Sequence, residues 1–394
     1  GADPAVRAVT PMTAEDKIEG KAGAAARYAV TTVAGAAGNR ARAEASSRGG
    51  TRVRSAAVGG RRMQRVRLSA TDVRELASDP AVVAIERVGT PEPHDESTSQ
   101  IVAGNLAAPA FTQPSGPGYL AWHDGKLPGP FDDVTIDVTD SGIDNGAPTT
   151  HADFHVDGSG ADRLIYARDY GTDANARDCS GHGTNVASIA AGYNQATGPS
   201  NEDSGLYNYG LGVAPRASIG ASKIFKCDGT NPGITLADLE DVASDASAGG
   251  ASISNNSWGT RPADWGSYSD SSALYDELVR DAQPGGADQA LIEVFSAGND
   301  GESGSTTISP EASAKNVITV GASEGVRPLG TTNGDGCEFD SEADNAREVA
   351  GFSSRGPTDD GRLKPDLVAP GTHVTGARPT HGGYLGNGTC TPVF

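Results

Sequence analysis

The sequence has few aromatic residues and no long apolar run. Phe, Trp and Tyr make up 5% of its 394 residues, so a large core must be built from Val, Ile, Leu and Ala, as in α/β proteins with buried parallel strands. No apolar run approaches the roughly 20 residues that a membrane-spanning helix needs. The sequence therefore predicts no membrane span.

Positive charge is also scarce, with 31 Lys and Arg against 51 Asp and Glu. The first 100 residues have a net charge of +3, so the remainder of the chain has −23. An acidic body argues against binding to nucleic acid or to an anionic membrane, since both require a positive surface. The contrast predicts two units that attract each other.

The four cysteines, Cys179, Cys227, Cys337 and Cys390, allow three pairings and form no CxxC motif. Zinc is therefore disfavoured, and disulfides in an exported protein are the better interpretation. The chain begins at Gly1 without a charged and then apolar leader. We accordingly expect that an export signal has been removed or was never included.

Residues 1–95 predict a small α+β domain. Ser69-Ala-Thr-Asp72 has the spacing of a helix capping box, and Asp79-Pro80 ends the short helix that follows. Strand-like patterns surround this helix at 27–33, 65–69 and 81–88. Residues 96–130 are rich in Pro, Gly, Ser and acidic residues, which predicts a linker or surface loop.

Residues 131–394 predict a doubly wound parallel sheet, because aliphatic strands alternate with helical segments. The expected strands are 134–140, 217–225, 252–257, 290–296 and 316–320, and the expected helices follow His182 and span 236–248 and 272–282. Ligands of such a sheet lie beyond the carboxyl ends of the strands.

Three polar side chains stand at or near those ends. His182 lies between two glycines at the start of a helix of small residues, Asp140 ends the first strand, and Asn299 follows another. Alone, each has an ordinary explanation as a helix cap or turn residue. Together they predict a catalytic base, the acid that orients it, and an amide donor to an oxyanion.

The motifs and their order resemble the subtilisin-like serine proteases. The matching segments are Asp140-Ser-Gly142, Gly181-His-Gly-Thr-Asn-Val-Ala187, Gly212-Val-Ala-Pro-Arg-Ala217, Asn256-Ser-Trp-Gly259, Ser296-Ala-Gly-Asn299, Phe352-Ser-Ser-Arg-Gly-Pro357 and Lys364-Pro-Asp-Leu-Val-Ala-Pro-Gly371. The resemblance implies a secreted endopeptidase with Asp140 and His182 in an Asp-His-Ser triad and Asn299 in the oxyanion hole. It assigns substrate binding to Ser257, Trp258, Gly259, Ser296, Ala297 and Gly298.

The same resemblance makes the first domain a propeptide that blocks the site, so that protein substrates and this domain are the expected partners. It implies disulfides Cys179–Cys227 and Cys337–Cys390. No cofactor for the chemistry is expected. Structural calcium is frequent in the family, and acidic loops such as Asp300-Gly-Glu302 or Asp359-Asp360 could supply ligands, but no ligand spacing in the sequence is specific enough to assign a site.

The family's nucleophile segment, Gly-Thr-Ser-x-Ala-x-Pro, is missing from the sequence. In one explanation Cys390, which follows Gly-Thr, occupies the serine position and acts as a thiol nucleophile. In the other, Cys390 is a disulfide partner, the peptidase domain is incomplete, and the serine lies beyond Phe394. A third interpretation of the missing segment is that the protein is a catalytically silent module that binds peptides.

Overall fold

The structure is a computed structural model. It describes residues 18–19, 26–33, 35–49, 55–58, 61–88, 96–127, 133–146, 151–198, 201–203, 205–227, 234–260, 265–284, 288–326, 343–374 and 376–381. The chain divides into two compact units, and the change from the first to the second falls between Pro91 and Glu92.

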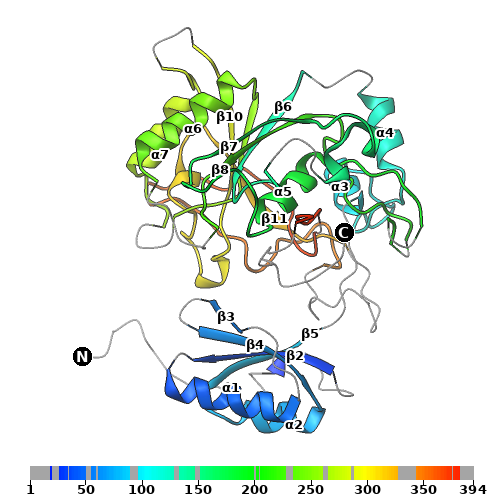
Figure 1. Cartoon of the computed structure of the whole chain (residues 1–394), viewed down its shortest axis with the longest axis vertical. Helices are drawn as coiled ribbons and strands as arrows, with labels where there is room; N and C mark the ends of the chain where they lie inside the picture. Colours follow the sequence, from blue (N-terminus) through cyan, green and yellow to red (C-terminus); the bar gives the residue numbers. More distant parts are fainter. Residues whose placement is uncertain are drawn as a thin grey trace. The chain divides into compact units, whose positions relative to one another are not determined.

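The first unit is a sheet with two helices on one face (Figure 1). The strand order is β1-β5-β2-β4-β3, with bounds Ile18–Glu19, Val82–Val88, Ala26–Val33, Arg61–Leu68 and Ser55–Val58. Helices α1 (Ala36–Gly49) and α2 (Ala70–Ala77) enclose a core that includes Val30, Leu68 and Ile85. The predicted capping box is present, since the backbone N–H of Asp72 donates to Ser69 Oγ and the backbone N–H of Ser69 donates to Asp72 Oδ2.

Seven parallel strands form the sheet of the described second unit, which confirms the predicted fold class. Their order is β12-β11-β10-β9-β6-β8-β7. The bounds in this order are Leu367–Pro370, Ile318–Ser323, Ile292–Ser296, Ile253–Asn256, Thr135–Asp140, Ser218–Lys223 and Leu164–Asp169. The parallel register places Asp140 and Asn256 near the same edge, because Thr139 pairs with Asn256.

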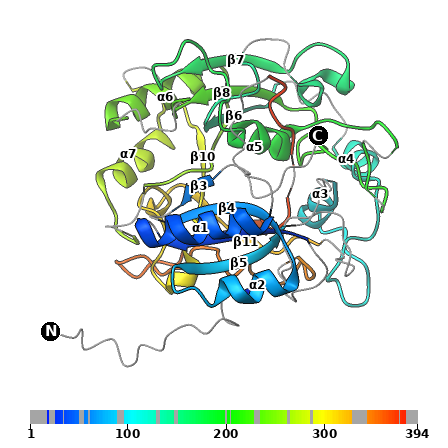
Figure 2. The ribbon, with the colours of Figure 1, turned by 60° about the horizontal axis from the view of Figure 1, so that its bottom comes forward.

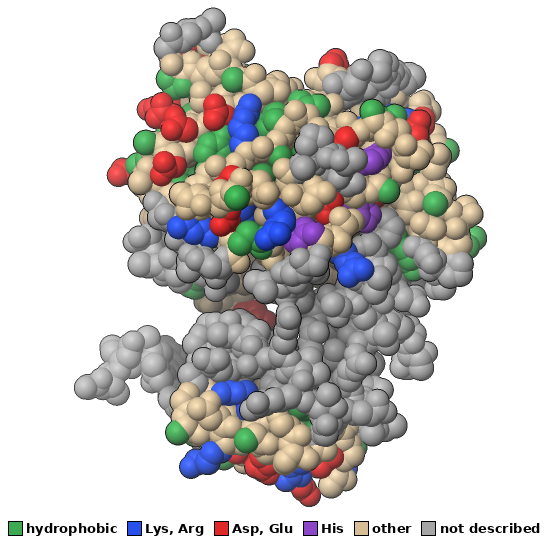
Figure 3. Space-filling model, in the orientation of Figure 1, with side chains coloured by type: hydrophobic (Ala, Val, Ile, Leu, Met, Phe, Trp, Pro, Cys, Tyr) green, Lys and Arg blue, Asp and Glu red, His purple; other side chains and the backbone are tan. Residues whose placement is uncertain are grey.

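Helices cover both faces of this sheet, as Figure 2 shows. Helix α5 (His182–Ala191) packs on the face that carries Ile136 and Val138, and α6 (Leu236–Ala248) and α7 (Asp270–Leu278) pack on the opposite face. Acidic side chains gather over α6 and α7 in Figure 3. Short 3-10 turns occur at Ala152–Phe154, Val156–Gly158, Gly301–Ser303 and Glu311–Ser313.

The predicted linker over residues 96–130 is wrong for its described part. Residues 96–127 belong to the second unit and contain α3 (Glu96–Val102) and α4 (Tyr119–Lys126). The carboxylate of Glu96 is buried and accepts backbone N–H groups of Gly118, Tyr119 and Asn208. Polar composition was misleading here because internal hydrogen bonds, rather than water, satisfy these groups.

Candidate active site

His182 and Asp140 form a hydrogen-bonded pair at the junction of β6 and α5. His182 Nδ1 lies 2.7 Å from Asp140 Oδ1, and the Asp140 side chain is buried while that of His182 is 43% exposed. The charge of Asp140 raises the pKa of His182 to about 9 against the opposing effect of burial. Because Nδ1 is engaged by the carboxylate, Nε2 is the nitrogen left to exchange a proton.

The loop before His182 is built around the buried carboxylate of Asp178. Its Oδ1 accepts the backbone N–H of Ser180 and Gly181 and the hydroxyl of Ser141. Its Oδ2 accepts the backbone N–H and the hydroxyl of Thr184. These five bonds fix the start of α5 and tie it to the loop that follows Asp140.

Glycine is required where the two loops meet. A Cβ added at Gly183 would lie 2.2 Å from the carbonyl oxygen of Gly142. Gly142 has a φ of 115° and Gly181 a φ of 92°, in the left-handed region that disfavours other residues. The glycines flanking His182 are therefore explained by close backbone approach and by turn geometry.

A cleft of about 490 Å³ brings His182 together with most of the predicted substrate-binding residues. Its lining includes Ser257, Trp258, Gly259, Ser296, Gly298 and Asn299. These residues follow β9 and end or follow β10, so the carboxyl ends of neighbouring strands form one wall. Ala297 does not line the cleft: it is buried, and its backbone N–H donates to the carbonyl of Val320.

Other lining residues were not identified from the sequence. Asn185, Val186 and Ile189 line the cleft from α5. They lie one and two turns beyond His182, so helical spacing from the histidine was a usable signal for them. Loop residues Trp265, Ser309 and Val374 also line it, and no local pattern marks them.

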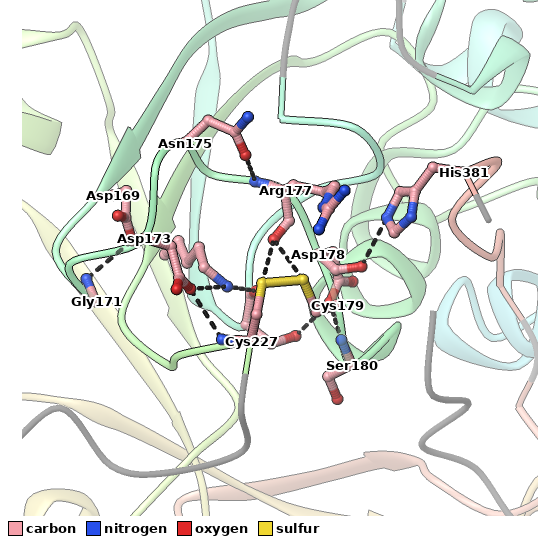
Figure 4. The surroundings of a disulfide bond; sticks show 12 residues. Asp169, Gly171, Asp173, Asn175, Arg177, Asp178, Cys179, Ser180, Cys227 and His381 are labelled. Carbon is pink, nitrogen blue, oxygen red and sulfur yellow. Dashed lines mark hydrogen bonds and ion pairs between the residues drawn. A yellow bond between two sulfur atoms is a disulfide. The ribbon is translucent and has the colours of Figure 1, made fainter. Parts of the chain in front are cut away.

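A disulfide joins the histidine loop to the segment that follows β8, as Figure 4 shows. Cys179 and Cys227 form the bond that the resemblance implies, with their Cα atoms 5.0 Å apart. Beside it, Asp173 accepts the backbone N–H of Cys227 and forms an ion pair with the buried Lys223. The bridge thus braces the loop that carries the candidate base. Cys337 and Cys390 lie outside the described residues.

The acidic loops suggested for calcium do not gather into a cluster of carboxylates among the described residues. Asp360 makes an ion pair with Arg362 at 2.8 Å instead. Within the described ranges, no group of three or more His, Cys, Asp or Glu side chains is arranged to hold a metal ion.

The chain belongs to the subtilase family of subtilisin-like serine proteases, because residues 132–391 match the Subtilase family. Pyrolysin of Pyrococcus furiosus is 31% identical over 234 residues, which cover 51% of this chain and 16% of pyrolysin. Subtilisin E of Bacillus subtilis is 26% identical over 323 residues, which cover 81% of this chain and 65% of subtilisin E. This chain therefore spans less than two thirds of either relative.

Among solved structures, the Prenylagaramide maturation protease PagA is 20% identical, with a TM-score of 0.37 over 63% of this chain and 66% of PagA. The described residues contain no helix that is long and apolar enough to cross a membrane.

Proposed function

We propose that this protein is a secreted serine endopeptidase that hydrolyses peptide bonds through an Asp-His-Ser triad. The observation that carries the proposal is the Asp140–His182 pair, placed at a cleft that Asn299 also lines. An imidazole oriented through Nδ1 by a buried carboxylate is suited to take a proton from a nucleophile and return it to the leaving amine.

The remaining cleft residues have matching roles. Asn299 is exposed and its side-chain amide donates to the oxyanion that forms when the scissile carbonyl is attacked. The walls after β9 and β10 hold the substrate as an added extended strand. Trp258 and Gly298 then contact the side chain that precedes the scissile bond.

The serine belongs to a further helix that packs beside α5. Three residues on the α5 face of the sheet support this: Ile292, Ile318 and Leu367 are 47%, 37% and 48% exposed. Residues paired across neighbouring strands point to the same face of a sheet. Ile136, on the α5 face of β6, pairs with Ile253 on β9, which pairs with Ile292 on β10. Two residues further along β10, Val294 pairs with Ile318 on β11, and Val320 of β11 pairs with Leu367 on β12. An apolar sheet face of this kind favours burial under another element.

The first unit is a propeptide that inhibits the site until it is removed. Its net positive charge and the acidic remainder of the chain support this role, because opposite charge strengthens docking. Inhibition by this unit is expected to weaken as salt is added. If inhibition does not change with salt, the opposite charges of the two units do not contribute to docking.

A fluorophosphonate probe tests the proposal on protein made from the complete reading frame. After verified removal of the first unit, we expect the probe to label one serine and His182→Ala to abolish labelling. Labelling of Cys390 by a thiol reagent, with loss of activity, would instead make that thiol the nucleophile. An unlabelled protein that still binds peptides would be the catalytically silent module, which the missing Gly-Thr-Ser segment favours.

A further inference from the structure

A buried glutamate lies behind the tryptophan that lines the cleft, and the proposed roles above do not use it. Glu293 is on β10 and is 1% exposed, facing the side of the sheet that carries α6 and α7. A carboxyl group in the middle of an apolar core is costly unless a specific interaction requires it. The contacts of Glu293 show what that interaction is.

Two hydrogen bonds connect Glu293 to the cleft. Asn256 Nδ2 donates to Glu293 Oε2 at 2.8 Å, and Trp258 Nε1 donates to Asn256 Oδ1 at 3.0 Å. Trp258 lines the cleft and its ring packs edge-on against Phe295. The path from the carboxyl group to the cleft wall therefore passes through a single buried amide.

The orientation of that amide depends on Glu293. Asn256 Nδ2 faces three acceptors, which are Glu293 Oε2, Ser254 Oγ and the Ser254 carbonyl. Turning the amide over would place Nδ2 against the indole N–H and leave two donors facing each other. The acceptors on the far side thus keep Oδ1 aimed at Trp258.

We propose that Glu293 is a positioning residue that fixes the Trp258 indole on the wall of the substrate cleft, acting through the Asn256 side chain. Assigning this wall to substrate rests on the proposed function, but the hydrogen-bonded path does not. The inference extends the substrate-binding set to two buried residues behind the cleft, Asn256 and Glu293.

The protonation of Glu293 gives this path a measurable signature. Burial raises the pKa of Glu293 to about 8, and its Oε1 has no hydrogen-bond partner in the described part of the chain. The titratable groups whose charges act on it or on its neighbours are Asp137 from β6, Tyr275 from α7 and Glu311. Glu293 therefore ionises at a higher pH than an exposed glutamate does, and its ionisation changes the acceptor that holds Asn256.

The test follows the indole N–H resonance of Trp258 by ¹⁵N NMR in the 394-residue chain between pH 6 and 10, assigned with Trp258→Phe. We expect this resonance to titrate with a midpoint at about pH 8 and to be flat in Glu293→Gln, which keeps the acceptor and cannot ionise. A flat wild-type resonance, or an unchanged titration in Glu293→Gln, would overturn the inference.

Two controls separate Glu293 from other groups that titrate in this range. His182→Ala removes the cleft histidine, whose pKa is about 9, and should leave the midpoint in place. Asp153→Asn removes another buried acid whose pKa is about 8 but which does not contact this path, and it should also change nothing. Loss of the titration in either control would contradict the assignment to Glu293.

The kinetics of peptide cleavage provide a second readout. Glu293→Leu and Asn256→Leu should each raise KM about tenfold, with kcat much less affected, as expected for one lost buried hydrogen bond. The double variant should be no worse than either single one, because both act through the same path. Additive increases in KM in the double variant would refute the proposal that both residues act through the same path. Since the resonance needs no catalysis, failure of this inference and failure of the proposed function are distinguishable.

Discussion

Replacing Asp140 with Asn tests the electrostatic basis of the candidate site. The carboxylate is the main cause of the rise of the His182 pKa from 6.5 to about 9, a net shift equivalent to about 3 kcal/mol in favour of the charged ring. The His182 side chain is 43% exposed, so solvent screens part of this energy and we expect about 1–2 kcal/mol. With the carboxylate gone, burial lowers the His182 pKa and only the smaller effect of the Asp178 charge still raises it, so this pKa should fall toward its ordinary value of 6.5.

The sign of the stability change follows from the direction of this pKa shift. A histidine whose pKa is raised in the folded state stabilises that state fully below pH 6.5, and the contribution is lost as the pH rises to about 9. Asp140→Asn should therefore destabilise the protein most at acidic pH. The difference between the variant and the wild type should become small above pH 9.

NMR titration of the His182 ring and urea unfolding across this pH range measure the two effects separately. Asp124→Asn is a control that removes the carboxylate beside a different histidine, since Asp124 lies 3.3 Å from the ring of His123 and is also paired with Arg216. It should leave the His182 titration unchanged. A His182 pKa that stays near 9 in Asp140→Asn would refute the assignment of the shift to Asp140.

Three further predictions concern the frame around the site. Gly183→Ala should destabilise by about 1–3 kcal/mol in thermal unfolding, since its Cβ would lie 2.2 Å from a carbonyl oxygen; Gly125→Ala, where the Cβ meets no atom within 4 Å, should not. Reduction of the Cys179–Cys227 disulfide should cost about 2–5 kcal/mol in urea unfolding, and a smaller loss would mean that the loop is held by its hydrogen bonds. Glu293→Gln should remove a stability loss of up to about 1.4 kcal/mol per pH unit that the wild type shows between pH 4.5 and about 8, and equal slopes in the two proteins would contradict it.

The strands and helices with simple patterns were predictable from the sequence. Helix α6 has the predicted bounds, Leu236–Ala248, because an amphipathic pattern coincides with a capping residue at Thr235. Strand β7, Leu164–Asp169, was missed, since Tyr166, Arg168 and Asp169 interrupt its apolar pattern. Those polar groups are accommodated by tertiary contacts, such as the hydrogen bond from the Tyr166 hydroxyl to Asp137, and no local rule indicates them.

The site was predictable only where its residues lie in short motifs. His182 and Asp140 are each followed by residues whose spacing reflects their loop geometry, and the structure brings their side chains together. Trp265 and Val374 reach the cleft from loops whose paths depend on the completed fold. Glu293 lies inside the expected strand 290–296 and nothing local marks it, because the reason for a buried acid lies in its partner on the neighbouring strand.

The two aspartates whose charges act on His182, Asp140 and Asp178, have different roles. The carboxylate of Asp178 accepts five hydrogen bonds, four from its own loop and the start of α5 and one from Ser141 of the other loop. Its loss would leave these N–H and O–H donors without an acceptor and would loosen both loops. Asp140 accepts from the backbone of Ser141 and contacts His182, while its Oδ2 has no partner among the described residues. A carboxyl group with an unpaired buried oxygen therefore stabilises the fold chiefly through its interaction with the charged ring of His182. Asp178 therefore fixes where the imidazole stands and its charge raises the His182 pKa to a lesser degree, whereas Asp140 is the main cause of the raised pKa.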